Sequence, residues 1–140
     1  MEIKVADSQK DYFQLQRVRR DVFVLEQNVT PVIEQDETDD WCIHLVAYDN
    51  DLAIATCRII LTDDNAVIGR LAVRKEYRRQ KVASALLRYT EQLPEVKEKG
   101  RITLHAQMSA YPLYEKCGYT PFGEHFYEAG IEHVEMEKYI

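Results

Sequence analysis

The stretch Arg78-Arg79-Gln80-Lys81-Val82-Ala83 has the composition and the position of a loop that binds phosphate groups. It lies between the apolar run Leu71-Ala72-Val73 and a segment with helical periodicity, so we expect it to join the end of a strand to the start of a helix. The first N–H groups of a helix have no partner within the helix and lie at the positive end of its dipole, so they can hold a pyrophosphate. A turn with solvated arginines is the alternative, and the stretch alone leaves both open.

Neither common glycine-rich phosphate motif is present. The sequence has no Gly-Lys-Ser/Thr, and no glycine lies between Gly69 and Gly100. Lys81 stands inside the turn, and we expect it to keep ordinary helical backbone angles, because a left-handed residue other than glycine costs about 1 kcal/mol or more.

The rest of the chain must supply elements that position this turn. Apolar periodicity predicts a strand, a helix, three consecutive strands, a helix, a strand, a short helix and two strands. This order indicates an α/β (α+β) fold with a mixed, mostly antiparallel sheet of about seven strands. Residues 66–73, 82–93 and 101–106 have the length of a βαβ unit, so their strands should be parallel neighbours. The expected ranges are a strand at 2–6, a helix at 9–25, strands at 41–48, 52–61 and 66–73, a helix at 82–93, a strand at 101–106, a short helix capped by Ser109, and a hairpin at 120–140 that turns near Ala129-Gly130.

Composition sets outer limits on function. A chain of 140 residues is the size of one domain, and we expect a single domain over 1–140. The net charge of -6 argues against nucleic acid as the main partner. No apolar run of about 18 residues occurs, and the first residues do not resemble a signal peptide, so we expect neither a membrane partner nor export.

Cysteine and histidine positions narrow the chemistry further. Three widely separated cysteines predict reduced thiols in a cytoplasmic protein. The four histidines show no spacing typical of a metal site, so we expect no metal. The basic residues between Arg74 and Lys81 and the acidic residues between Glu34 and Asp40 form two charged runs, either solvated loops or one site for an anion and one near a cation.

Two motifs in this order resemble the GNAT superfamily of acyl-CoA-dependent N-acetyltransferases. Its phosphate turn reads Gln/Arg-x-x-Gly-x-Gly/Ala after a Leu-Ala-Val strand; Arg78 and Ala83 match the first and last positions, and Lys81 replaces the first glycine. Its later segment, Asn-x-x-Ala-x-x-Leu-Tyr-Glu-Lys-x-Gly-Phe, resembles residues 107–119, with Gln107 in place of the asparagine. The resemblance implies the GNAT fold, with helices on both faces of the sheet, and direct transfer of the acetyl group of acetyl-CoA to an amine.

The similarity extends over nearly the whole chain to the ElaA-like branch. Four further segments carry it, and that branch often has Lys at the position of Lys81. These segments are Val22 to Asn28, Ile68-Gly69-Arg70, Ala106-Gln107 and Ala129 to His133.

The resemblance implies a role for each matched residue. Tyr114 matches the tyrosine that protonates the departing thiolate in many GNAT enzymes, and the alternative is a core tyrosine whose hydroxyl bonds a backbone group. Arg74 is a further basic residue that either reaches outer phosphates or is solvated. Residues implied to bind acetyl-CoA are Leu71, Ala72, Val73, Arg78, Arg79, Gln80, Lys81, Val82, Ala83, Ser84 and Gln107.

The general base and the acceptor site are less defined. Val67 stands where some GNAT proteins have a catalytic glutamate, so the candidates are Glu26, directly or through a chain of water molecules, and His133. A histidine titrates in the range that a base requires, whereas a surface or hydrogen-bonded role is the alternative. Arg70, Glu26 and Gln27 are candidates for acceptor binding. Arg70 favours a carboxylate or phosphate on the acceptor, unless it forms an ion pair with the acidic run.

Two function classes therefore compete. The first is an N-acetyltransferase acting on a primary amine, expected to be a small molecule. The second is a non-catalytic acyl-CoA-binding or interaction domain with the same fold. Tyr114 favours the enzyme, whereas Lys81 and Val67 depart from the family pattern. The sequence leaves the acceptor and a homodimer open.

Overall fold

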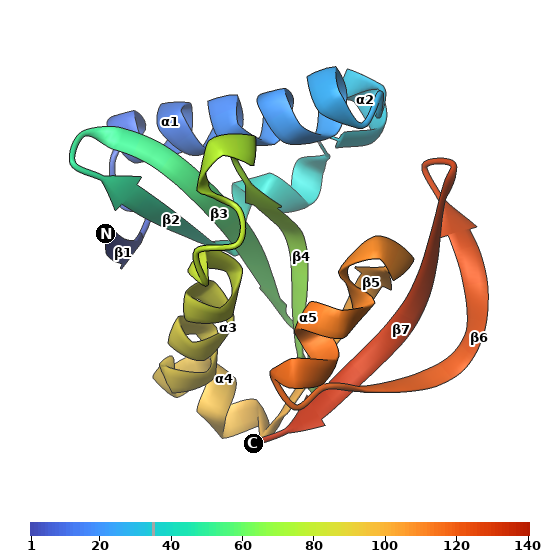
Figure 1. Cartoon of the computed structure of the whole chain (residues 1–140). Coiled ribbons are helices and arrows are strands. Elements are labelled where there is room, and N and C mark those ends of the chain that lie inside the picture. The colour runs from blue at the N-terminus through green and yellow to red at the C-terminus, as the bar shows by residue number, and fades with distance from the viewer. Residues whose placement is uncertain (35) are drawn as a thin grey trace.

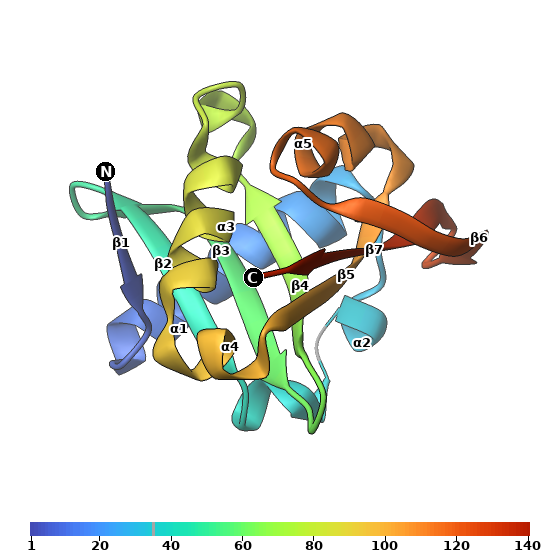
Figure 2. The same ribbon diagram turned by 90° about the horizontal axis from the view of Figure 1, so that it is seen from below.

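Seven strands form one sheet in the order β1-β2-β3-β4-β5-β7-β6 (Figures 1 and 2). The computed structural model describes residues 1–34 and 36–140, so Gln35 in the acidic run lies outside the described residues. All neighbouring strands are antiparallel except β4 and β5, which are parallel, as predicted for the βαβ unit. The strands are β1 (Glu2–Val5), β2 (Ile43–Asp49), β3 (Leu52–Leu61), β4 (Ala66–Val73), β5 (Arg101–Gln107), β6 (Thr120–Glu128) and β7 (Ile131–Tyr139).

Helices cover both faces of the sheet. α1 and α2 lie on one face, and α3, α4 and α5 lie on the other (Figure 2). Within the described residues, no helix is both long and apolar enough to cross a membrane. The helices are α1 (Gln9–Arg19), the π-helix η1 (Arg20–Glu26), α2 (Pro31–Glu34), α3 (Val82–Gln92), α4 (Pro94–Lys99) and α5 (Tyr111–Lys116), with 3-10 turns η2 (Glu37–Asp40), η3 (Lys75–Tyr77) and η4 (Met108–Ala110).

Helix α1 starts where the sequence predicts. The Ser8 hydroxyl accepts a hydrogen bond from the Asp11 N–H at 3.1 Å, and the Asp11 carboxylate accepts one from the Asp7 N–H at 3.2 Å. Leu15, Val18 and Val22 are buried against the sheet.

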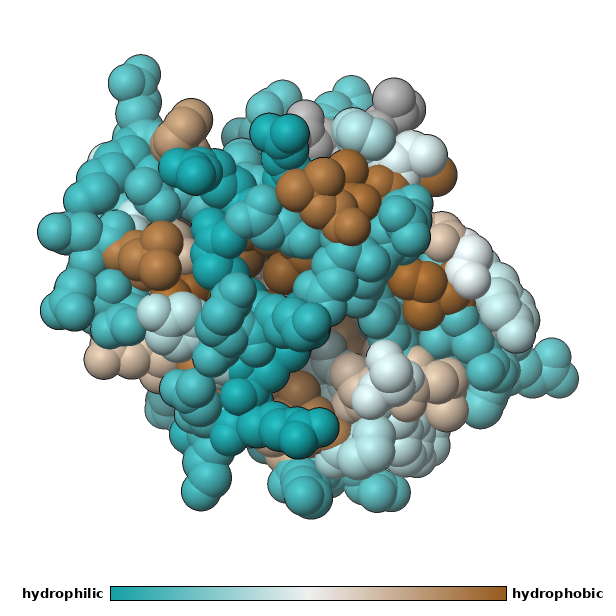
Figure 3. Space-filling view, turned by 45° about the horizontal axis from the view of Figure 1, so that its top comes forward, coloured by the Kyte–Doolittle hydropathy of each residue, from teal (hydrophilic) through white to brown (hydrophobic). Residues whose placement is uncertain are grey.

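Two apolar residues of the predicted helix at 9–25 are not buried: Tyr12 is 42% exposed and Leu25 is 62% exposed. The cause near Leu25 is the π-helix: the Gln27 N–H donates to the Val22 carbonyl, five residues back, at 3.0 Å. This wider turn rotates Leu25 outward and places Phe23 on the buried side. On the face seen in Figure 3, apolar residues form separate patches within a mainly hydrophilic surface.

Two predicted boundaries need adjustment. Pro94 ends the α3 pattern as expected, but it also starts α4, because its missing N–H is tolerated in a first turn. Ser109 does not cap α5; the cap is Ala110, which makes no side-chain hydrogen bond, and the 3-10 turn η4 leads into the helix instead. The β6–β7 hairpin turns at Ala129 and Gly130, as predicted, with φ of 52° and 76°.

The parallel strands β4 and β5 stay paired only over part of their length. Their register runs from Ala66↔Ile102 to Ile68↔Leu104 and then stops. Beyond that point the strands diverge, as Figure 2 shows. On the other side of β4 a bulge sets Arg70 and Leu71 opposite Cys57 alone, with Arg70 at a φ of 50°. The fold therefore opens a gap in the sheet beside the end of β4.

Candidate active site

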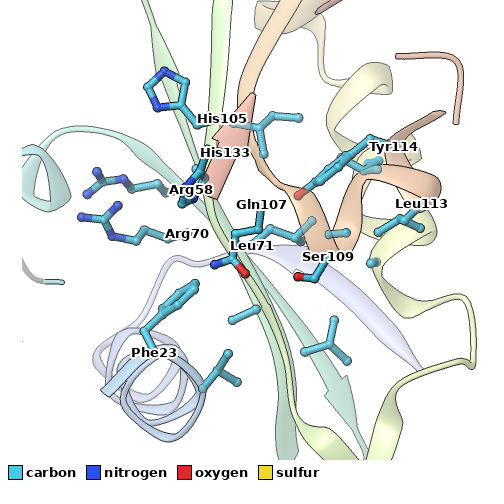
Figure 4. Close-up of a pocket in the computed structure, with 18 of the residues that line it drawn as sticks. Phe23, Arg58, Arg70, Leu71, His105, Gln107, Ser109, Leu113, Tyr114 and His133 are labelled. Carbon is cyan, nitrogen blue, oxygen red and sulfur yellow. The ribbon is translucent and has the colours of Figure 1, made fainter. Parts of the chain in front are cut away.

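A cleft of about 1610 Å³ opens at this gap (Figure 4). Figure 4 shows Leu71 and Gln107 near its middle, with Tyr114 on one side and Arg58 and Arg70 on the other. We name the two sides the turn branch and the arginine branch. The turn branch is lined by residues 71–73, 78–79, 81–84 and Tyr114, and the arginine branch by Phe23, Arg58, Gly69, Arg70, His105 and His133.

The turn after β4 contains two left-handed residues. Arg79 has a φ of 63°, and Lys81, the N-cap of α3, has φ 65° and ψ 20°. The prediction of helical angles at Lys81 is therefore wrong. The physical reason is that the chain leaves the 3-10 turn η3 and must reverse into α3 between Arg78 and Val82, and the left-handed residues make that reversal. Each costs roughly 1–2 kcal/mol, which explains why glycine suits the corresponding position in the GNAT pattern.

Free N–H groups of α3 face the turn branch. The first helical bond of α3 runs from the Ala85 N–H to the Lys81 carbonyl at 3.0 Å, so the N–H groups of residues 82–84 have no acceptor within the helix. These three residues line the cleft. Gln80 does not line it, and its amide instead donates to the Glu76 carbonyl at 3.2 Å.

Arg78 links the turn to η1. Its guanidinium donates two hydrogen bonds of 2.6 Å to the Glu26 carboxylate, and its Nε donates to the Val73 carbonyl at 3.0 Å. Arg78 lowers the pKa of Glu26, and Glu26 raises the pKa of Arg78. Glu26 does not line the cleft. An ion-paired carboxylate with a lowered pKa is a weak base, so the geometry disfavours Glu26 as the general base.

The Tyr114 side chain is buried, but its hydroxyl points into the cleft toward Gln107 and Ser109 (Figure 4). Among the described residues, no group forms a hydrogen bond with that hydroxyl. The alternative of a core tyrosine bonded to the backbone is therefore not what the structure shows. Burial raises the pKa of Tyr114, so the phenol stays neutral and can act as a proton donor.

His133 lies at the border of the two branches. It is 6% exposed and stacks on Phe126, with ring centroids 5.7 Å apart. Its Nδ1 lies 2.7 Å from the Ile131 carbonyl oxygen, which can only accept, so Nδ1 carries the proton. In the neutral ring, Nε2 is then a proton acceptor with no hydrogen-bond partner in residues 1–34 and 36–140, as a general base requires.

Gln27 and Gln107 join η1 to β5 across the cleft. Their amides exchange two hydrogen bonds, of 3.3 Å and 3.0 Å. Gln107 is also the direct cross-strand neighbour of His133. Gln107 therefore lies beside Leu71 near the middle of the cleft, between its partner Gln27 and the arginine branch that contains His133.

Arg70 holds the acidic run in place. This agrees with the second of its two predicted roles, an ion pair with that run rather than binding of an anionic acceptor group. Its Nε donates to the Glu34 carbonyl at 3.0 Å, and its Nη2 donates to the Ile33 carbonyl at 3.1 Å. Its distance to the Asp36 carboxylate is 3.5 Å. The side chain still lines the cleft, so anchoring and ligand contact are compatible.

Sequence reasoning missed Arg58 and misjudged Arg74. Arg58 is a lone charge in the apolar strand β3, which is the signal that could have marked it. Arg74 does not reach the turn: it pairs with Asp21, and its Nε donates to the Ala53 carbonyl at 2.8 Å.

One group of potential metal ligands occurs in the described part of the chain. It comprises Asp39, Cys42 and His44, whose ligand atoms lie within 4.8 Å of one another. The Asp39 carboxylate already binds Arg19 and Arg58, and burial raises the pKa of Cys42 to about 11. Two guanidinium groups and a protonated thiol disfavour a cation there. The three cysteines are free thiols.

Comparison with known proteins shows the family. Residues 10–140 match the acetyltransferase (GNAT) domain. The chain belongs to the GNAT acetyltransferase family. It is 34% identical to the uncharacterised N-acetyltransferase YjcF of Bacillus subtilis, over 86% of this chain and 87% of YjcF.

The ElaA-like resemblance is also confirmed. The chain is 31% identical to the protein ElaA of Escherichia coli, over 91% of this chain and 87% of ElaA. The crystal structure of that protein superposes with a TM-score of 0.76 at 25% identity, covering 99% of each chain. An aminoglycoside 6'-N-acetyltransferase in complex with coenzyme A shares the fold, with a TM-score of 0.77 at 17% identity over 99% of this chain and 97% of that one.

Transfer of an acetyl group to an amine is the general reaction of the GNAT family, and members of this fold bind coenzyme A. The chain is thus an acyltransferase by family.

Proposed function

We propose that this protein transfers the acetyl group of acetyl-CoA directly to the primary amine of a small molecule. One observation carries the proposal: the free N–H groups of the turn and the unpartnered hydroxyl of Tyr114 open into one cleft, at the point where β4 and β5 diverge. Acetyl-CoA supplies the acetyl group as a thioester. Its site fits the residues present, because a diphosphate needs several converging N–H donors.

The residues of the turn bind and orient the donor. The N–H groups of Arg79 and of residues 81–84 hold the diphosphate, and the positive charges of Arg79 and Lys81 add to the attraction. The bulge in β4 takes Leu71 out of regular pairing, so a backbone N–H between Leu71 and Val73 can donate to the thioester oxygen as negative charge develops there.

Two side chains move protons. His133 Nε2 accepts a proton from the ammonium of the acceptor, which makes the amine nucleophilic. The Tyr114 hydroxyl donates its proton to the sulfur as the carbon–sulfur bond breaks. A phenol has a pKa near 10 and a thiol near 8.5, and burial raises that of Tyr114, so the proton moves only once charge has developed on sulfur. The proton that the attacking nitrogen loses as the amide forms then restores the neutral phenol.

Two measurements test this proposal. Acetyl-CoA at about 100 times its dissociation constant should stabilise the fold by roughly 2.7 kcal/mol, a shift of several degrees in melting temperature. Thiol release in a screen of amines then separates an enzyme from an acyl-CoA-binding domain. If acetyl-CoA does not change the melting temperature, both the enzyme and the acyl-CoA-binding domain are contradicted. If acetyl-CoA stabilises the fold but no amine releases thiol, the result supports the binding domain.

A further inference from the structure

The arginine branch contains a glycine that the fold does not require. Gly69 does not have a positive φ, and a Cβ built on it would lie 3.7 Å from Arg58 Nε and 3.9 Å from Arg58 Cγ, which are ordinary contacts. Another residue would therefore fit the backbone. What the missing side chain provides is open space on the floor of the branch, directly beside Arg58.

Two arginines border this space. Arg58 and Arg70 extend side by side in Figure 4, from neighbouring strands. The Arg58 side chain is buried, with Nη1 and Nη2 bound to Asp36 at 2.7 Å and 3.1 Å. Its Nε is buried and has no partner in the described residues. That nitrogen lies nearest the Cβ position of Gly69 but is closed to solvent, so Arg58 acts on this space through its charge.

The guanidinium group of Arg70 also has hydrogen-bond donors that are not used within the described residues. Its hydrogen bonds use Nε and Nη2 and go mainly to uncharged backbone carbonyls, while Nη1 has no hydrogen-bond partner among the described residues. Its left-handed backbone, at a φ of 50°, costs roughly 1–2 kcal/mol. The bulge in β4 enforces this conformation, and strained residues of this kind cluster at active sites and ligand-binding segments.

The carboxylates near Arg70 are bound mainly by other arginines. Glu34 and Asp39 pair with Arg19, and Asp36 and Asp39 pair with Arg58, whereas the only ion pair of Arg70 among the described residues is the 3.5 Å contact with Asp36. Burial, and then the charges of Arg58 and Arg19, lower the pKa of Arg70. At Arg58, burial acts against the charge, but Asp36 and Asp39 outweigh it and raise the pKa. Across the branch, His105 is paired with Glu128 at 2.9 Å. An added anion would thus stabilise Arg70, whereas an added cation would meet it as a like charge.

We propose that the acceptor carries an anionic group, a carboxylate or a phosphate, which binds above Gly69 to Arg70, beside the positive charge of Arg58. The proposal rests on the proposed acetyl transfer for the position of the reacting amine, beside Leu71. Gly69 lies two residues earlier on the strand, at most about 7 Å away, because the bulge at Arg70 shortens the regular rise. The acceptor is therefore an amine with its anionic group about four or five bonds from the nitrogen, not a polyamine.

Four amines of similar length test the class. They are 4-aminobutyrate, 3-aminopropyl phosphate, butylamine and 1,4-diaminobutane, each assayed with acetyl-CoA by thiol release. We expect kcat/KM for at least one of the two anionic amines to exceed that of butylamine about tenfold or more, with the diamine poorest. The better of the two identifies carboxylate or phosphate as the group. Equal use of butylamine, or preference for the diamine, overturns the proposal.

Variants locate the effect. Arg70→Gln should remove the preference for the anionic amine. Arg74→Gln, the same change at the end of β4 on a side chain outside the cleft, should keep it. Because Arg70 also anchors α2, Gly69→Val is the second test: it fills the floor and should raise KM for the anionic amine about tenfold, with an unchanged dissociation constant for acetyl-CoA. Retention of the preference in both Arg70→Gln and Gly69→Val overturns the proposal.

Binding measured without turnover separates this inference from the proposed function. Calorimetry with 4-aminobutyrate, 3-aminopropyl phosphate and butylamine reports on the anion site even in a protein that transfers no acetyl group. Tighter binding of an anionic amine, lost in Gly69→Val, supports the site whatever the outcome with acetyl-CoA. Transfer to butylamine with no tighter binding of either anionic amine would leave the acetyltransferase standing and reject the anion site.

Discussion

The Tyr114 hydroxyl is the group whose role can be isolated most cleanly. Tyr114→Phe removes one oxygen that has no hydrogen-bond partner among the described residues, so the fold should lose little stability. We expect kcat to fall about 10²–10⁴-fold, the usual contribution of a positioned acid, with an unchanged dissociation constant for acetyl-CoA. Tyr111→Phe, at the first residue of the same helix and outside the cleft, is the matched control. Wild-type turnover in Tyr114→Phe would rule out the acid role.

The two candidate bases make opposite predictions. A base must be unprotonated, so turnover falls on the acid side of the pH–rate profile, and loss of the base flattens that limb. We expect His133→Gln to lower turnover and flatten it. Glu26→Gln should leave the limb in place, because Arg78 holds Glu26 outside the cleft with a lowered pKa.

A stability measurement and a control variant accompany this test. Glu26→Gln should lower the free energy of unfolding by less than about 1 kcal/mol, since the ion pair of Glu26 with Arg78 is exposed to solvent. His125→Gln, on an exposed histidine of β6, is the control for His133. A flattened limb in Glu26→Gln alone would reverse the assignment.

Lys81 shows where reasoning from one residue fails. Its preference for helical angles is real, but the reversal from β4 into α3 outweighs it. The local sequence has no glycine to absorb the positive φ, so neither Arg79 nor Lys81 signals its conformation. The family pattern holds that information, in the glycine that Lys81 replaces.

At the scale of elements, the sequence predicts the regular strands and turns but not the irregular segments. The strands, the parallel unit and the hairpin turn at Ala129-Gly130 follow from alternation, length and turn chemistry. The π-helix at Arg20–Glu26 and the bulge at Arg70 carry no such pattern. These two irregular segments place Phe23, Gln27 and Arg70 at the cleft, so the parts hardest to predict from sequence are the parts that shape the site.

The attachment of η2 to the sheet gives a prediction about acid stability. Burial opposes ionisation of Asp39, but Arg19 and Arg58 outweigh it and lower its pKa from 3.8 to about 2. A lowered pKa stabilises the fold above the unfolded value, and this contribution, on the order of 2 kcal/mol, is lost as the pH falls from about 4 to 2.

Asp39→Asn should therefore lose about 2 kcal/mol in urea unfolding at pH 7 and show a smaller further loss between pH 4 and 2. Asp40→Asn, on the exposed neighbour, should behave as wild type. An equal loss in both variants would show that the ion pairs of Asp39 do not stabilise the fold.

For the whole molecule, the cleft divides the sheet into two parts with few direct connections. Strands β1–β4 form one part and β5, β7 and β6 the other, joined by three paired positions between β4 and β5. The pairing of β4 with β5 joins residues that are far apart in the chain. The sequence alone therefore predicts that the two strands are parallel neighbours, but not the residue at which their pairing stops. The gap exists because pairing stops at Ile68↔Leu104.

A ligand that spans this gap should protect both parts together. We expect acetyl-CoA to slow amide hydrogen exchange at residues 71–73 and 79–84, and also at Gln107 on the opposite side, because its diphosphate, thioester and linking chain contact both parts. Helix α4, which does not line the cleft, should exchange as before and serves as the internal control. A diphosphate alone should protect the turn but not Gln107. Protection confined to the turn by acetyl-CoA itself would mean that the donor does not enter the gap, and would exclude reaction beside Leu71.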